Sequence, residues 1–137
     1  MTPENNIDPQ AVSTLSLAFV GDAVFELLTR TERLKEHNSN ARALAKASQA
    51  LVNAGAQARM YYLLEPLLAE DELAVLRRGR NAKSAGRAKN ATVADYRHAT
   101  GLEALFGYLY LLGRRDRICQ LFGLCMTVDK GVRHEGQ

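Results

Sequence analysis

The feature that most constrains this chain is an apolar segment, residues 15–30, that carries two carboxylates. Apolar residues cover nearly every side of this segment when it is drawn as a helix, and such a helix is normally buried. Asp22 and Glu26 are four residues apart, so they share one face. A buried carboxylate is costly unless it is paired, hydrogen-bonded or bound to a cation. Gly21 costs a helix interior about 1 kcal/mol relative to alanine, which indicates close approach of another helix, a ligand or a second copy of the chain.

The rest of the sequence predicts an all-α fold, because apolar residues recur at three- and four-residue spacing and no segment alternates with period two. The 137 residues fit one domain, 1–137, with a core over about 13–126 and polar tails. The expected helices cover 13–34, 41–64 with an interruption near 53–55, 70–78, 92–113 and 114–126. The expected signals at their ends are N-caps at Ser13, Ser39 or Asn40, and Thr92, a stop at Pro66, and C-terminal glycines at Gly79 and Gly113. We expect a frayed tail over 127–137.

Composition excludes several classes of protein. The N-terminus has no apolar signal segment and no apolar run approaches the length of a membrane span, so we expect a soluble cytoplasmic protein without membrane contact. Cys119 and Cys125 lie in an apolar stretch and are predicted to be reduced core thiols. The three histidines show no metal-binding spacing with them. No Gly-rich phosphate loop or nucleophile set is present, and no small-molecule cofactor is expected.

An acidic pair is the first candidate for chemistry. Asp22 has Gly21 beside it, and Glu103, in the apolar stretch LEALFGYLYLL, has Gly107 one turn later. If these two helices pack together, the glycines allow close approach and the carboxylates converge. Mg²⁺ binds through one or two carboxylates and accepts phosphate oxygens as further ligands. The alternative is that each acid is structural and pairs with an arginine or a helix end.

A basic segment, RGRNAKSAGRAKNA at 78–91, is the second candidate. It contains no acid and is predicted to be a loop. Cations, amides, hydroxyls and small residues suit a phosphate backbone, and the lack of aromatic residues favours double-stranded over single-stranded RNA. The alternative is a solvated, flexible loop. The candidate RNA-binding residues are Arg78, Arg80, Asn81, Lys83, Ser84, Arg87 and Lys89.

Three motifs together resemble a known family. FVGDAVFELLTR at 19–30 is similar to the signature helix of ribonuclease III endonucleases, and LEALFGYL at 102–109 is similar to the second acidic helix of that family. RRGRNAKS at 77–84, the short chain and the lack of an appended double-stranded RNA-binding domain resemble the Mini-III branch. The resemblance covers about residues 13–126.

This resemblance implies an all-helical, homodimeric endonuclease that cuts both strands of an RNA duplex with Mg²⁺. It implies Asp22 as the catalytic aspartate and Glu103 as the catalytic, metal-binding glutamate. Members of the Mini-III branch are associated with maturation of the 23S ribosomal RNA precursor, which would make that precursor the partner.

The sequence departs from the ordinary ribonuclease III pattern at two positions. Ala18 stands where that pattern has a glutamate, and Thr100 stands where it has an aspartate. Glu26 is a candidate to compensate, or to pair with an arginine. The missing carboxylates keep a rival function open, a non-catalytic, dimeric helical RNA-binding module such as a ribosome-assembly factor. A purely structural dimerisation protein would leave the basic segment without a purpose.

Overall fold

The computed structural model describes residues 5–36, 40–83 and 92–135, and within these ranges it contains helices and no strands, which confirms the all-α prediction. The helices are α1 (Thr14–Glu36), α2 (Ala41–Val52), α3 (Ala54–Leu64), α4 (Glu70–Asn81), α5 (Val93–Leu111) and α6 (Arg115–Glu135). Short 3₁₀ turns lie at Pro9–Ala11 and Glu65–Leu67. None of the described helices is long and apolar enough to cross a lipid bilayer.

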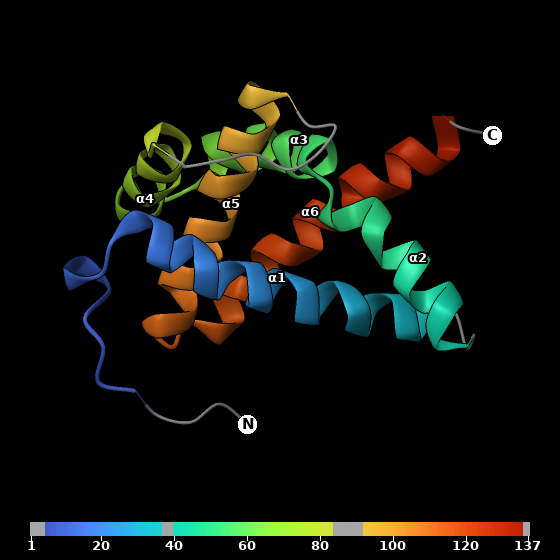
Figure 1. Cartoon of the computed structure of the whole chain (residues 1–137), viewed down its shortest axis with the longest axis horizontal. Coiled ribbons are helices and arrows are strands. Elements are labelled where there is room, and N and C mark those ends of the chain that lie inside the picture. The colour runs from blue at the N-terminus through green and yellow to red at the C-terminus, as the bar shows by residue number, and fades with distance from the viewer. Residues whose placement is uncertain (1–4, 37–39, 84–91, 136–137) are drawn as a thin grey trace.

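Helix α5 is the centre of the molecule. Figure 1 shows α1 crossing it on one side, with α3 and α4 packed around its first half. Nearly every residue of α5 from Ala99 to Leu109 is buried. Phe25 of α1 meets Phe106 of α5 and Phe122 of α6 edge-on, each with ring centroids 5.6 Å apart, and this contact joins three helices into one core.

Helix α1 is not buried on every side, so that prediction was wrong. One face of α1 packs on α5 through residues such as Leu17 and Phe25. The opposite face is in solvent, with Leu15, Phe19 and Leu27 exposed by 42%, 81% and 67%. An all-apolar helix in this chain therefore marks a surface that the single chain leaves uncovered.

The predicted helix starts are confirmed by side-chain caps. The Ser16 amide donates to Ser13 Oγ at 3.1 Å, the Ala43 amide to Asn40 Oδ1 at 2.9 Å, and the Asp95 amide to Thr92 Oγ1 at 3.0 Å. The interruption near 53–55 is also present, since Asn53 separates α2 from α3 and caps α3. These polar residues satisfy helix amides that have no partner within the helix.

Two predicted helix ends were wrong. Gly79 lies inside α4, which continues to Asn81, because this glycine serves a close helix contact: a Cβ on it would lie 2.6 Å from the Cα of Gly101. The last helix, α6, continues through the predicted frayed tail to Glu135. The sequence of this segment contains no proline, the residue that most strongly ends a helix. Gly113, by contrast, does end α5, at a φ of +74°.

The cysteine prediction is partly wrong. Both thiols are free, but only Cys125 is in the core, and Cys119 is exposed. Burial raises the pKa of the Cys125 thiol to about 12, so that this group is unreactive as a nucleophile.

Candidate active site

The site is built on a direct backbone contact between α1 and α5. A Cβ on Gly21 would lie 1.6 Å from the carbonyl oxygen of Glu103, and one on Gly107 would lie 2.0 Å from the carbonyl oxygen of Leu17. Real Cβ atoms do not approach other atoms this closely. The two glycines therefore let the helix backbones touch, as the sequence predicted. Each of the two helices carries a carboxylate beside the crossing point.

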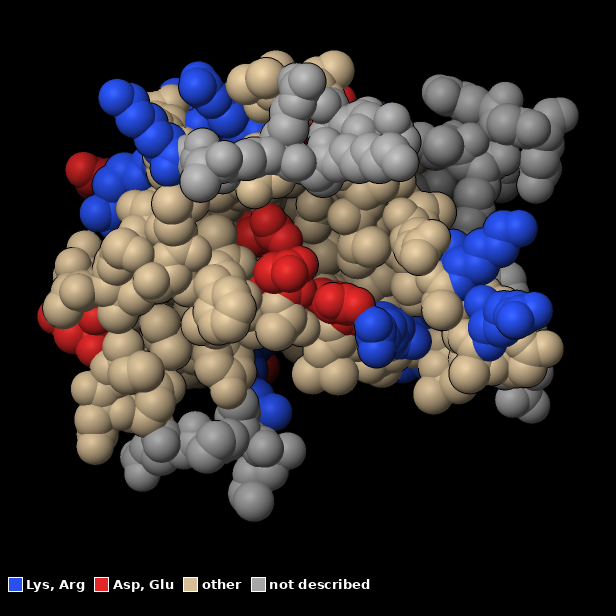
Figure 2. All heavy atoms as spheres, viewed as in Figure 1, with Lys and Arg blue, Asp and Glu red and all other residues tan. Residues whose placement is uncertain are grey.

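The crossing brings Asp22 of α1 and Glu103 of α5 together. Their carboxyl groups lie close enough to form a hydrogen bond when Glu103 carries its proton. Burial, followed by the hydrogen bond and the charge of Asp22, raises the pKa of Glu103 from 4.5 to about 9. Acidic side chains accordingly gather at the centre of one face of the molecule, where α1 crosses α5 (Figure 2).

Neither carboxylate forms an ion pair with a lysine or arginine in the part of the chain that the structure describes. Two acids that face each other without a cation repel when both are ionised. Glu26 forms an ion pair with Arg30 one turn further along α1, which is the second of the two roles predicted for it. The described residues also hold no cluster of three or more metal-binding side chains of the His, Cys, Asp or Glu type.

Gln57 is a third member of the site, and the sequence analysis missed it. This residue of α3 is only 3% exposed, and its side-chain amide lies close enough to the Glu103 carboxyl group to oppose the rise in the Glu103 pKa. A glutamine in an alanine-rich helix carries no signal of its own. Only the packing of α3 on α5 reveals it.

The predicted basic loop is partly wrong, because Arg78, Arg80 and Asn81 lie in helix α4, whereas Lys83 follows the end of this helix. Arg78 and Lys83 are exposed, and Asn81 accepts a hydrogen bond from Arg80 Nε at 3.1 Å. Basic side chains gather above α4 on the face that also carries the acidic centre (Figure 2). Ser84, Arg87 and Lys89 lie outside the described residues.

Comparison with known proteins identifies the family of this chain. The family model described as the Ribonuclease III domain matches residues 15–114. A Mini-ribonuclease 3 of Brevibacillus brevis is 44% identical over 124 residues, which are 90% of this chain and 92% of that protein. A Mini-ribonuclease 3 of Thermoanaerobacter is 42% identical over 86% of this chain and 83% of that protein. The chain belongs to the ribonuclease III family.

Within the ribonuclease III family this chain is an endoribonuclease of the Mini-ribonuclease 3 group, as the resemblance predicted. A crystal structure of a protein from Fusobacterium nucleatum has the same fold, with a TM-score of 0.80 and 31% identity. That similarity covers 88% of this chain and 99% of the other.

The two positions at which this chain departs from the ordinary ribonuclease III pattern lie in packed surroundings. Ala18 is 8% exposed and offers no ligand. Thr100 is 7% exposed, and its hydroxyl donates to the carbonyl of Tyr96 in the preceding turn at 3.0 Å. Both positions therefore serve the helix packing, and neither adds a carboxylate to the pair formed by Asp22 and Glu103.

Proposed function

We propose that this endoribonuclease cleaves double-stranded RNA with the help of Mg²⁺ held by Asp22 and Glu103. The observation that carries the proposal is the convergence of two carboxylates, without a cationic side chain beside them, where α1 crosses α5. A magnesium ion takes one or two protein carboxylates and fills its remaining positions with water and phosphate oxygens, so that this donor set fits it.

The residues of the chain have separate tasks in this scheme. Asp22 and Glu103 would hold the cation, and the positive charge of a bound cation would favour the ionised form of Glu103, which burial disfavours. Mg²⁺ bound there would supply an activated water and neutralise charge on the phosphate that is cleaved. The Gly21–Gly107 contact fixes the spacing of the two carboxylates, since it fixes the helices that carry them.

The basic end of α4 is proposed to bind the duplex backbone. Arg78 and Lys83 are exposed and form no ion pair with the other described residues, so that they are available to phosphates. Arg80 is less available, because its guanidinium donates to Tyr61 Oη at 3.1 Å and lies 3.8 Å from a Glu65 oxygen. Asn81, Ser84, Arg87 and Lys89 complete the proposed RNA-binding set.

We further propose that the enzyme is a homodimer that processes the 23S ribosomal RNA precursor in the cytoplasm. The exposed apolar face of α1, formed by Leu15, Phe19 and Leu27, supports the dimer, because an apolar face of this extent commonly marks an interface. The choice of RNA rests on the resemblance to the Mini-III branch. Incubating the protein with a precursor transcript and mapping the new 5′ ends tests that choice.

The central experiment is cleavage of a long double-stranded RNA at low salt with Mg²⁺. We expect the wild type to cut, and Asp22→Asn and Glu103→Gln to bind the duplex but cut at least about 100-fold more slowly, since loss of outer-shell partners alone costs 10- to 100-fold. We expect Ca²⁺ not to replace Mg²⁺. A wild type that binds the duplex and never cuts it with any metal would contradict the proposal and restore the non-catalytic RNA-binding module.

A further inference from the structure

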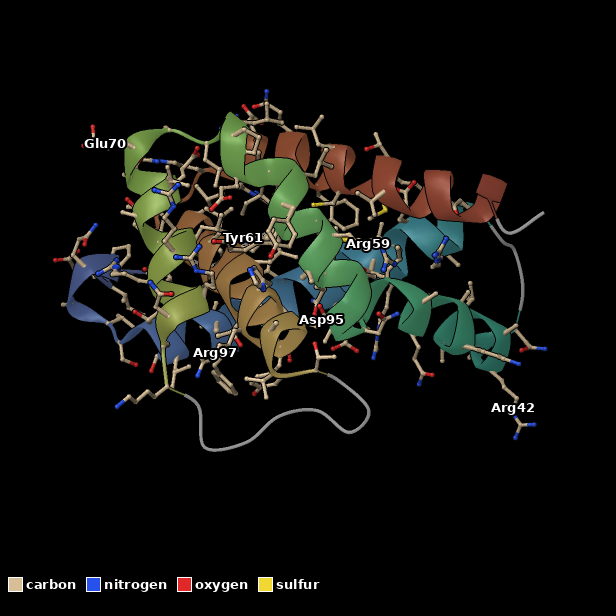
Figure 3. All side chains as sticks on the ribbon, turned by 90° about the horizontal axis from the view of Figure 1, so that it is seen from above. Arg42, Arg59, Tyr61, Glu70, Asp95 and Arg97 are labelled. Atoms are coloured by element: carbon tan, nitrogen blue, oxygen red, sulfur yellow. The ribbon has the colours of Figure 1, made fainter. Side chains whose placement is uncertain are left out.

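The position of Gln57 is fixed by the break between α2 and α3. Asn53 ends α2 and caps α3, because its Oδ1 accepts from the Ala56 amide at 2.8 Å and its carbonyl from the Gln57 amide at 3.1 Å. Gln57 therefore lies in the first turns of α3, on the side that packs against α5. Figure 3 shows α3 lying against α5, with Arg59 and Tyr61 marking α3 and Asp95 marking the start of α5.

The side chain of Gln57 is a buried amide, and a buried amide needs hydrogen-bond partners. The carboxyl group of Glu103 lies within reach of this amide, because α3 packs directly on α5. A primary amide donates through its NH₂ group and can thus hold a carboxylate oxygen without adding charge.

We propose that Gln57 is a positioning residue, whose side-chain amide holds the Glu103 carboxylate in the orientation in which it faces Asp22. The inference rests on the proposed function of that acidic pair. Ala18 and Thr100 supply no ligand, so that a cation depends on the orientation of only two carboxylates. A fixed orientation of Glu103 reduces the side-chain freedom that is lost when the cation binds.

Two readouts of Mg²⁺ binding test this role. The first is the Mg²⁺ concentration that gives half of the metal-dependent rise in Tm, and the second is the Mg²⁺ concentration that gives half-maximal cleavage of double-stranded RNA. Gln57→Met keeps the length of the side chain but loses the amide. We expect both midpoints to rise about tenfold or more in this variant, while duplex binding without Mg²⁺ stays as in the wild type. Gln49→Met, at an exposed position of α2, is the matched control and should change neither midpoint.

A double-mutant cycle separates positioning from a general effect on packing. If Gln57 acts through Glu103, then Gln57→Met should leave the residual Mg²⁺ response unchanged in a protein that already carries Glu103→Gln. Should Gln57→Met fail to fold, Gln57→Asn retains the amide on a side chain one methylene shorter, and we expect it to raise both midpoints as well.

Different outcomes overturn different claims. A wild type that cuts and is stabilised by Mg²⁺, together with Gln57→Met or a folded Gln57→Asn at wild-type midpoints, overturns the role of Gln57 alone. An equal shift from Gln57→Met with and without Glu103→Gln also overturns it, because the effect would then not pass through Glu103. A wild type that neither cuts nor gains stability with Mg²⁺ overturns the proposed function, and the role of Gln57 with it.

Discussion

At the scale of single residues, Glu103 couples the site to pH. Its pKa in the folded protein is raised to about 9, mainly by burial, whereas the ordinary value is 4.5. Between these values the unfolded chain has lost the proton and the folded protein keeps it. The metal-free fold therefore has its full stability from this group below about pH 4.5 and loses it as the pH rises toward 9, by at most about 1.4 kcal/mol per pH unit.

The substitution Glu103→Gln should remove this dependence. We expect the variant to be more stable than the wild type at pH 8 in EDTA and equally stable near pH 4.5, as measured by urea unfolding. Saturating Mg²⁺ should stabilise the wild type much more than the variant. A variant that is less stable than the wild type at every pH would show instead that the carboxyl group has a structural role.

At the scale of elements, the Gly21–Gly107 contact decides whether α1 and α5 can cross. In Gly21→Ala the new Cβ meets the backbone of Glu103, which cannot move aside as a flexible side chain could. We expect a loss of about 3 kcal/mol or more in the free energy of unfolding, measured by chemical denaturation. Cleavage should fall as well, because the separated helices also separate Asp22 from Glu103.

The control for this substitution is Gly123→Ala in α6. That glycine is exposed, and a Cβ on it would meet nothing within 4 Å. Its replacement should be neutral or should stabilise the protein by up to about 1 kcal/mol through helix propensity. Equal losses at Gly21 and Gly123 would rule out the contact as the cause.

Some features of these helices depend on a few neighbouring residues, and others depend on the packing of one helix on another. The caps at Ser13, Asn40 and Thr92 could be predicted, because a cap is satisfied within its own turn. The role of Gly79 could not, since the same glycine can end a helix or allow another helix to approach, and only the position of Gly101 decides between these roles.

Ion pairs between helices that are far apart in the sequence could not be predicted either. The sequence explains Glu72 by its place in the first turn of α4, yet this side chain is 3% exposed and receives two hydrogen bonds of 2.8 Å from Arg117 of α6. These hydrogen bonds keep the pKa of Glu72 below its usual range despite burial. At the candidate site, in the same way, the acidic pair follows from two local motifs, whereas the place of Gln57 depends on a third helix.

At the scale of the whole molecule, the distribution of charge predicts how RNA binding responds to salt. Each lysine or arginine that contacts a phosphate releases counterions, so that Arg78→Gln and Lys83→Gln should each reduce the slope of log K against log salt by about 1. Filter binding of a fixed duplex at several salt concentrations, with Ca²⁺ in place of Mg²⁺, measures this slope.

Arg115→Gln is the matched control for charge. Its neighbour Arg114 contacts Asp71 at the start of α4, which places Arg115 at the opposite end of α4 from Arg78. The slope should stay at the wild-type value. Equal effects of all three substitutions would mean that net charge, rather than the basic end of α4, governs binding.

The exposed apolar face of α1 predicts that the protein assembles as a dimer through this helix. Leu15, Phe19 and Leu27 lie at spacings of four and eight residues on a helix whose other side is fully packed. Burying Phe19, now 81% exposed, would contribute about 1.5–3 kcal/mol in each subunit of a dimer. Phe19→Asp should therefore convert a dimer into a monomer at micromolar concentration, as measured by sedimentation equilibrium, while Tyr62→Asp on α3 should remain dimeric.

The monomer should also bind duplex RNA more weakly than the dimer, because two linked sites bind one duplex more tightly than one site does. A wild type that is monomeric throughout this range would contradict the assembly and leave the apolar face for a different partner.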